Sequence, residues 1–201
     1  IYYNVDAIHT AIAENSQITF RYFQWNVKKE MELRKGGARY RVSPWALSCD
    51  DENYYMIAYD DVEEKIKHFR VDKMLHIEMN GKKREGKQVF QSFDIAVYSR
   101  KMFGMYGGEE QLVKIQCVNE LAGVIIDRFG KEISMIPVDG KHFTASVRVA
   151  VSRQFLSWVM ALGEGAKIVG PEPVVEQVRE ETKRLMQQYD IKTDSYKNKT
   201  T

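Results

Sequence analysis

Basic and aromatic side chains are interleaved on three short segments of the chain, and these residue types could bind an anion. The segments carry Arg39, Tyr40 and Arg41, then Tyr54, Tyr55 and Tyr59, then Lys67, His68, Phe69, Arg70 and Lys73. Arginine holds a phosphate group with its planar fork, and an aromatic ring stacks on a nucleic-acid base. If the three segments are paired strands, these groups meet on one patch, which suits a polyanion.

The same alternation has a simpler explanation. Arg39 and Arg41 lie on one face of a strand, and Tyr40 and Val42 lie on the other. In any half-buried strand the tyrosines would be core and the cations would form a solvated outer face. The residues by themselves leave both interpretations open.

Catalytic chemistry has no comparable pattern in this sequence. The four histidines, His9, His68, His76 and His142, have no metal-ligand spacing, and the chain contains no phosphate-binding loop, dinucleotide fingerprint or nucleophile elbow. We therefore expect no enzyme, no catalytic residue, no metal and no cofactor. Cys49 and Cys117 predict buried free thiols in a reducing cytoplasm.

Composition places the chain among folded proteins without identifying a partner. Of its 201 residues, 44% are hydrophobic, and the formal net charge is +2. A claim of nucleic-acid binding must therefore rest on local clustering of charge. No apolar run reaches the roughly 20 residues that span a bilayer, and no signal peptide is visible. The expected location is the cytoplasm, without a membrane partner, and the initial Ile1 suggests a fragment of a longer protein.

The first half predicts one helix followed by short strands. Asn4 is a candidate helix N-cap, with Val5, Ile8 and Ile12 at helical spacing behind it. Alternation then predicts strands near 18–23, 38–42, 54–59, 66–71 and 75–79, with a charged stretch over 28–35 and with Pro44 ending the second strand. Strands this short, without crossover helices, favour a small antiparallel barrel.

The second half predicts a different fold. Its pattern of strand, helix, two strands, helix, strand and terminal helix is typical of ferredoxin-like domains. Between the halves, Phe93, Ile95 and Val97 predict a short strand, and Gly104, Gly107 and Gly108 predict a hinge. The fold class is therefore α+β, and the predicted divisions are a barrel domain over 1–85, a linker over 86–108, a ferredoxin-like domain over 109–190 and a tail over 191–201.

Four ordered segments of the first half resemble the WYL-domain family of bacterial transcriptional regulators. Tyr54–Asp60 resembles the Trp-Tyr-Leu signature of the family, and residues 11–22 resemble its helix and first strand. Arg41–Leu47 resembles its second strand, and Lys67–Met74 resembles its "R-x-F-R-L-D-R-I" segment. The segments 155–158 and 162–171 resemble the C-terminal extension of the family. The resemblance implies an Sm-like, SH3-type barrel with a ferredoxin-like domain that commonly supports a homodimer. It also implies an N-terminal helix-turn-helix, outside this chain, that binds DNA.

The resemblance implies an effector site on the barrel for single-stranded nucleic acid or a nucleotide. Its residues here would be Arg41, Tyr54, Tyr55, Lys67, His68, Arg70 and Lys73, with Tyr22 and Arg39 as further candidates. Tyr54 and Met56 replace the signature Trp and Leu, and Lys67 and Lys73 stand where the family usually has Arg. Lysine lacks the planar fork, so phosphate binding would depend on Arg41 and Arg70.

Two hypotheses of function follow. In the first, the chain is the ligand-sensing and dimerisation part of a transcriptional regulator. Ligand binding then changes the conformation of the DNA-binding domain, which lies outside this chain. In the second, the barrel is a protein interaction or dimerisation module with the tyrosines as interface anchors. An accessory RNA-binding protein without effector sensing would use the same face as the first.

Overall fold

The chain forms two structural units, and the computed structural model describes residues 1–50, 52–91, 98, 101–102 and 109–191 of it. Contacts divide the chain into residues 1–99 and residues 100–201. Each unit has its own hydrophobic core, so each is described by itself. The predicted strand at 93–97 and the predicted glycine hinge at 104–108 lie outside the described residues.

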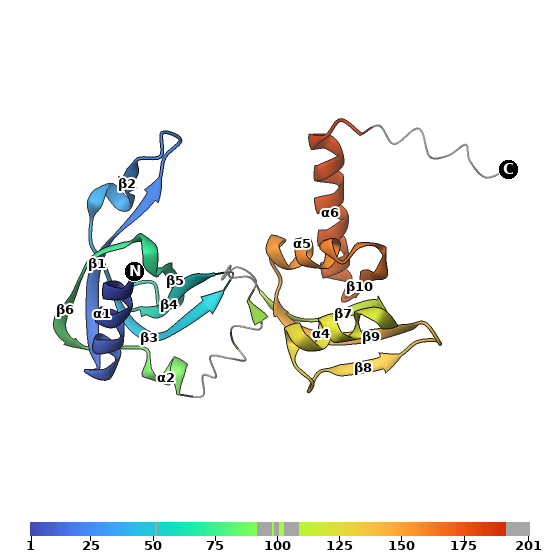
Figure 1. The fold of residues 1–201 in the computed structure, drawn as a ribbon, viewed down its shortest axis with the longest axis horizontal. Coiled ribbons are helices and arrows are strands. Elements are labelled where there is room, and N and C mark those ends of the chain that lie inside the picture. The colour runs from blue at the N-terminus through green and yellow to red at the C-terminus, as the bar shows by residue number, and fades with distance from the viewer. Residues whose placement is uncertain (51, 92–97, 99–100, 103–108, 192–201) are drawn as a thin grey trace. The chain divides into compact units, whose positions relative to one another are not determined.

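The first unit is an N-terminal helix followed by a curled antiparallel sheet (Figure 1). Its helices and strands are α1 Tyr2–Ala13, β1 Ser16–Trp25, β2 Met31–Leu33, β3 Tyr40–Asp50, β4 Asn53–Asp60, β5 Lys65–Arg70, β6 Met74–Lys83 and α2 Lys87–Phe90. The predicted α+β class and the helix-plus-barrel architecture are confirmed. The charged stretch over 28–35 contains an unpredicted strand, β2, which forms a projecting two-stranded arm with the end of β1.

Strand β1 is the central element of this sheet. It pairs with β2, β3 and β6, and the sheet continues from β3 through β4 to β5. The ladder between β1 and β6 contains two register shifts, and the ladder between β3 and β4 contains one between Pro44 and Ala46. Bulges of this kind bend a strand and increase its twist, which curls the sheet into an open barrel. Pro44 therefore does not end the second strand, because a bulge tolerates a residue without an amide hydrogen.

The barrel core lies on the face of the sheet that helix α1 covers. Ile18, Phe20 and Tyr22 of β1 are buried there, as their alternation predicts. Helix α1 adds Ile8 and Ala11, both fully buried. Asn4 is not the N-cap, because the helix begins at Tyr2. The Asn4 amide instead donates to the carbonyls of Val71 and Met74, at 2.9 and 2.8 Å, and ties the helix to the barrel.

A smaller apolar cluster covers the other face of strands β3 to β5. It contains Ile57, Tyr59 and Phe90, with Trp45 and Ile66 packed against them. The Trp45 ring stacks on Phe90 of α2 at a centroid distance of 5.0 Å. Its Nε1 donates to the Glu85 carbonyl at 2.8 Å. Residues 85–90, inside or beside the predicted linker, are therefore packed against the barrel.

Over residues 109–191, the second unit is a four-stranded antiparallel sheet with the helices α4, α5 and α6 (Figure 1). Its elements are β7 Glu110–Val118, α4 Ala122–Phe129, β8 Ser134–Pro137, β9 His142–Ala150, α5 Arg153–Ala161, β10 Ala166–Gly170 and α6 Glu172–Gln188. The strand order is β10-β7-β9-β8, so the first and third strands of the βαββαβ pattern are neighbours. The predicted ferredoxin-like fold is confirmed. The core of this unit includes Ile115, Ile125, Val147, Phe155 and Val174.

The two cysteines differ in environment. Cys117 is buried, and burial raises the pKa of its thiol to about 11. Cys49 is exposed, so the expectation of two buried thiols is wrong for this residue. It lies near the end of β3, opposite Tyr54 of β4, which is also exposed. Within the described ranges, no helix is long and apolar enough to cross a membrane.

Candidate functional site

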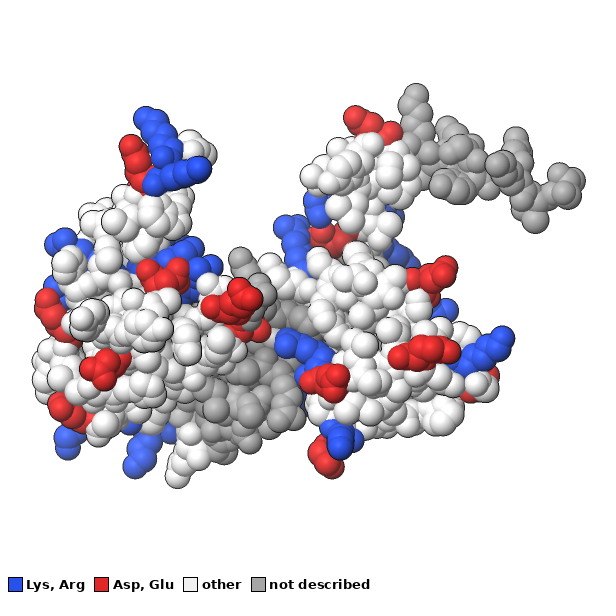
Figure 2. Space-filling view, viewed as in Figure 1, with Lys and Arg blue, Asp and Glu red and all other residues white. Residues whose placement is uncertain are grey.

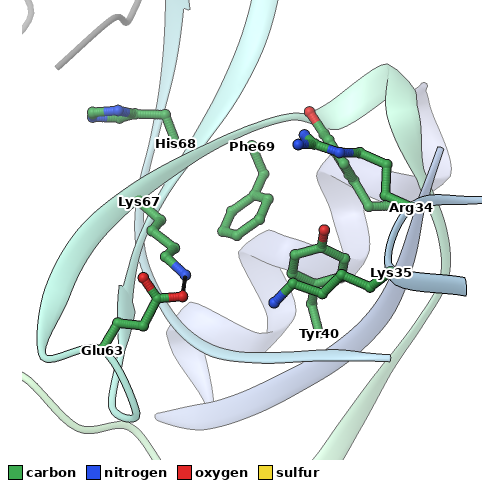
Figure 3. Close-up of a pocket in the computed structure, with 8 residues that line it drawn as sticks. Arg34, Lys35, Tyr40, Glu63, Lys67, His68 and Phe69 are labelled. Atoms are coloured by element: carbon green, nitrogen blue, oxygen red, sulfur yellow. Dashed lines mark hydrogen bonds and ion pairs between the residues drawn. The ribbon is translucent and has the colours of Figure 1, made fainter. Parts of the chain in front are cut away.

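A cavity of about 280 Å³ opens on the barrel between the base of the projecting arm and strand β5. It is lined by three cations, one carboxylate and aromatic rings, namely Arg34, Lys35, Lys67, Glu63, Tyr22, Tyr40 and Phe69, together with His68. Figure 3 shows Lys67 and Glu63 on one side of this cavity and Arg34 and Lys35 on the other. In this cavity, opposite elements of the unit bring several charged groups together.

Arg34 and Lys35 belong to a tight 3₁₀ turn, Arg34–Gly37, that connects the arm to β3. Lys35 has φ 53° and ψ 36°, in the left-handed region that a lysine rarely adopts, and Gly36 follows with φ 60°. The turn brings the Lys35 amine over the Tyr40 ring at 4.4 Å and the Arg34 guanidinium over the Tyr22 ring at 5.9 Å. Backbone strain of this kind often occurs at binding sites.

Lys67 approaches the cavity from β5, on the same face of the strand as buried Phe69. Its amine donates to Asp60 at 2.6 Å and to Glu63 at 2.5 Å. Partial burial lowers the pKa of Lys67, but these two hydrogen bonds outweigh burial and raise the pKa above its usual value. Lys67 is therefore a firmly charged cation already held by two carboxylates.

Tyr22 and Tyr40 form the apolar floor of the cavity. Both are buried in the barrel core, at 7% and 9% exposure. The Tyr22 hydroxyl accepts a hydrogen bond from the Arg70 backbone N–H at 3.0 Å. Burial raises the pKa of Tyr22, so its hydroxyl stays protonated and keeps a hydrogen to donate. For Tyr22, the structure supports the core interpretation and also places the residue at the cavity.

Tyr55, His68 and Arg70 point to the opposite face of the sheet. The β4–β5 register pairs Tyr55 with Arg70 and Ile57 with His68, on the side of the small apolar cluster. The His68 ring contacts the Tyr98 hydroxyl at 3.1 Å and points away from the cavity in Figure 3. Arg70 forms a two-pronged ion pair with Asp72, at 3.0 and 2.8 Å.

The other predicted site residues are spread over the barrel. Arg39 makes a two-pronged ion pair with Glu78 at 2.7 Å, and Arg41 contacts Asp61 at 3.2 Å. Tyr54 is 45% exposed near the start of β4. Lys73 lies on the turn Val71–Lys73. Partial burial raises the pKa of the neighbouring Asp72. The hydrogen bond from Arg70 and the charges of Arg70 and Lys73 outweigh burial and hold this pKa below its usual value.

The structure does not bring all nine predicted site residues to one face of the sheet, since Lys67 and Arg70 lie on opposite faces of β5. Of the nine predicted site residues, Tyr22 and Lys67 line the cavity, His68 borders it with its ring turned away, and the other six do not line it. The reason is the pleat: adjacent residues on a strand point to opposite faces. Sequence reasoning missed Arg34, Lys35, Tyr40, Glu63 and Phe69 as members of a site. Arg34 and Lys35 stand directly before Gly36-Gly37, and this sequence indicates a basic turn. That signal could have identified these two residues as site candidates.

Charge on the molecule is mixed at larger scale. Figure 2 shows positive and negative side chains interspersed over the visible face, as the near-neutral total predicts. Among the described residues, no group of three or more histidine, cysteine and acidic side chains could hold a metal ion. The cavity can therefore contribute positive charge, hydroxyl donors and aromatic surface, which is the chemistry of an anion site with a ring beside it.

Comparison with known proteins agrees with this architecture. Residues 3–79 match the WYL domain, and residues 109–186 match the WCX domain. No curated protein sequence matches the chain. Among solved structures, the chain aligns with the proteasome accessory factor B/C (PafBC) of Arthrobacter aurescens, which is 23% identical with a TM-score of 0.38. A CRISPR Cas-related protein is 13% identical with a TM-score of 0.49.

Both alignments cover 94% of this chain but only 27% and 52% of those two proteins. The chain thus spans about a quarter and about half of their lengths. Membership of a family therefore rests on the two domain matches, which agree in order and position with the two structural units. The chain therefore contains a WYL domain over residues 3–79, followed by a WCX domain over residues 109–186.

Proposed function

We propose that this chain is the effector-sensing part of a transcriptional regulator, and that the barrel cavity binds a phosphate-bearing ligand. The ligand class is single-stranded nucleic acid or a nucleotide. The observation that carries the proposal is the cavity itself, in which Arg34, Lys35 and Lys67 meet above Tyr22 and Tyr40. A phosphate group needs several cationic donors, and a base needs a neighbouring ring.

Ligand binding would act on the arm. Arg34 and Lys35 lie on the turn between the arm and β3, whereas Lys67 lies on β5. An anion held by both sides links the turn to the far end of the sheet, and so favours one position of the arm over others. In a longer regulator, this change in the position of the arm would alter the position of a DNA-binding helix-turn-helix. Both the helix-turn-helix and the homodimer remain predictions.

The test is a titration of labelled single-stranded DNA and RNA, followed by fluorescence anisotropy at low and moderate salt. Lys35→Ala and Lys67→Ala should each weaken binding and reduce its salt dependence by about one phosphate contact. Lys82→Ala, an exposed lysine on β6 outside the cavity, is the matched control and should have no such effect. Unchanged affinity in both cavity variants would contradict the cavity assignment.

The same titration separates two positions for the site. The prediction from resemblance places phosphate capture on Arg41 and Arg70, which are bound to Asp61 and Asp72 away from the cavity. If Arg41→Ala and Arg70→Ala weaken binding while the cavity variants do not, the ligand binds on the outer face of the sheet.

A second candidate function is a protein interaction module. It is favoured by apolar side chains on the arm, where Trp25 is 56% exposed and Met31 is 59% exposed. Exposed aromatic and methionine side chains are typical anchors of protein interfaces. Absence of any nucleic-acid binding even at low salt would favour this second function.

A further inference from the structure

Glu63 is the only carboxylate that lines the cavity among the described residues. One of its oxygens accepts from the Lys67 amine and the other from the Lys65 amine, each at 2.5 Å. Figure 3 shows this carboxylate reaching the Lys67 amine across the cavity from Lys35. An anion that enters and approaches Lys67 therefore meets a negative group that is already bound there.

The two carboxylates on Lys67 are held very differently. Asp60 is buried, at 7% exposure, and its other oxygen accepts from the backbone N–H groups of Val62 and Glu63 at 3.0 and 3.1 Å. The Glu63 side chain is 43% exposed, and among the described residues it forms ion pairs with Lys65 and Lys67. Asp60 is thus part of the turn, whereas Glu63 can leave Lys67 without breaking backbone hydrogen bonds.

We propose that Glu63 is a built-in competitor that makes this cavity select a terminal phosphate monoester over an internal phosphodiester. The inference rests on the function proposed above and specifies its ligand class. The preferred ligand is a nucleotide or a nucleic-acid end that carries a terminal phosphate.

The selection follows from charge and from the number of acceptor atoms. A phosphodiester carries one negative charge and two free oxygens, as the Glu63 carboxylate does. Exchange of one for the other gains no charge, and the ligand also loses freedom on binding. A phosphate monoester carries about −1.5 to −2 charges at neutral pH and three strong acceptor oxygens. It can hold Lys67 more strongly than Glu63 does and has further oxygens to accept from Lys35 or Arg34, which also line the cavity.

The test uses one short thymidine oligonucleotide, labelled at its 3′ end, with either a 5′-phosphate or a 5′-hydroxyl group. Titration by fluorescence anisotropy gives the affinity of the whole chain for both probes. The wild-type chain should prefer the 5′-phosphate. Glu63→Gln keeps the size of the side chain and removes its charge, so affinity for the 5′-hydroxyl probe should rise by about three- to fivefold, and the preference should shrink.

Glu64→Gln is the matched control, because Glu64 is the adjacent exposed acid on the same turn and does not line the cavity. It should leave the preference for the 5′-phosphate unchanged. Circular dichroism of each variant checks that the fold is retained.

The possible failures are distinguishable. If both probes bind equally well to the wild-type chain, and Glu63→Gln changes neither affinity, the proposed competition by Glu63 is refuted. The proposal that the cavity binds an anion is then kept. If Glu64→Gln has the same effect as Glu63→Gln, the effect is general electrostatics and the role of Glu63 is also refuted. If neither probe binds to any variant, the proposed function itself is refuted.

Discussion

Each of four cations that sequence reasoning assigned to ligand binding already has a carboxylate partner. Arg39 pairs with Glu78, Arg41 with Asp61, Lys67 with Asp60 and Glu63, and Arg70 with Asp72. A ligand must compete with these partners, so the affinity of each position depends on how firmly its carboxylate is held.

Asp60 predicts a loss of stability at acid pH. Burial raises the pKa of its carboxyl, but hydrogen bonds from Lys67, Glu63 and Val62 outweigh burial and hold the pKa below 3.8. Because the folded pKa lies below the unfolded one, the stabilisation is present above about pH 3.8 and is lost as the pH falls through the folded value. Urea unfolding between about pH 2.5 and 6 measures this loss.

Asp60→Asn should flatten this pH dependence, because the amide does not titrate. Asp6→Asn, on the exposed side of α1, serves as the control and should leave the pH dependence as it is. An equally steep fall in the free energy of unfolding for Asp60→Asn would show that other carboxyls carry the effect.

Tyr22→Phe should weaken the fold. The substitution removes the acceptor of the Arg70 backbone N–H and leaves that donor part-buried without its partner. The expected loss in the free energy of unfolding is about 1–2 kcal/mol, measured by urea denaturation. Tyr54→Phe changes a tyrosine that is 45% exposed, and should have almost no effect. Equal losses in the two variants would contradict the structural role of the Tyr22 hydroxyl.

At the scale of helices and strands, bulges and turns of the sheet determine which side chains lie close together. The bulge between Pro44 and Ala46 lets β3 contribute Leu47 to the barrel core and Trp45 to the cluster on the other face. The turn after the arm places Arg34 and Lys35 opposite β5. Both features depend on local breaks in the alternation of the strand, so regular strand patterns do not predict them.

The packing of α2 on β4 can be tested through Gly86. Gly86 precedes α2 with φ 81°, and a Cβ there would lie 2.4 Å from Cγ of the Tyr59 ring. Gly86→Ala should therefore cost about 2 kcal/mol more than Gly81→Ala, because Gly81 has φ 75° but nothing within 4 Å of its Cβ position. Urea unfolding of the two variants gives the comparison. Similar losses would mean that only the backbone angle matters.

The whole molecule consists of two units with separate cores, each of about a hundred residues. The core of the second unit is built from its own helices and strands, including Phe155 of α5 and Val174 of α6. A domain of this size buries enough apolar surface to fold alone. Each unit can therefore be produced and tested on its own.

Residues 100–201, produced as a fragment, should fold cooperatively. The expected result is a single sigmoidal thermal transition by circular dichroism, with the helical signal of α4, α5 and α6. The full chain is the reference. A broad transition without cooperativity would show that the second unit needs residues 1–99 for its fold.

Apart from β2 and α2, the sequence by itself determined the kinds of element described in the structure, their order and the two fold types. Periods of two and 3.6 residues are local signals, and burial of one face fixes them, as for Ile18, Phe20 and Tyr22 on β1. The same local signal predicted that Tyr40 and Arg41 point to opposite faces, and the burial of Tyr40 agrees with it. The resemblance to the WYL family likewise required only ordered motifs.

The tertiary structure decided which of these side chains meet. The pairing of Tyr55 with Arg70, the contact of Lys67 with Asp60 and the position of Lys35 beside Tyr40 follow from strand register and from one turn. Register depends on contacts between residues far apart in the chain, which no local pattern encodes. For that reason the sequence indicated a basic and aromatic barrel, whereas only the fold separated its cavity from its outer face.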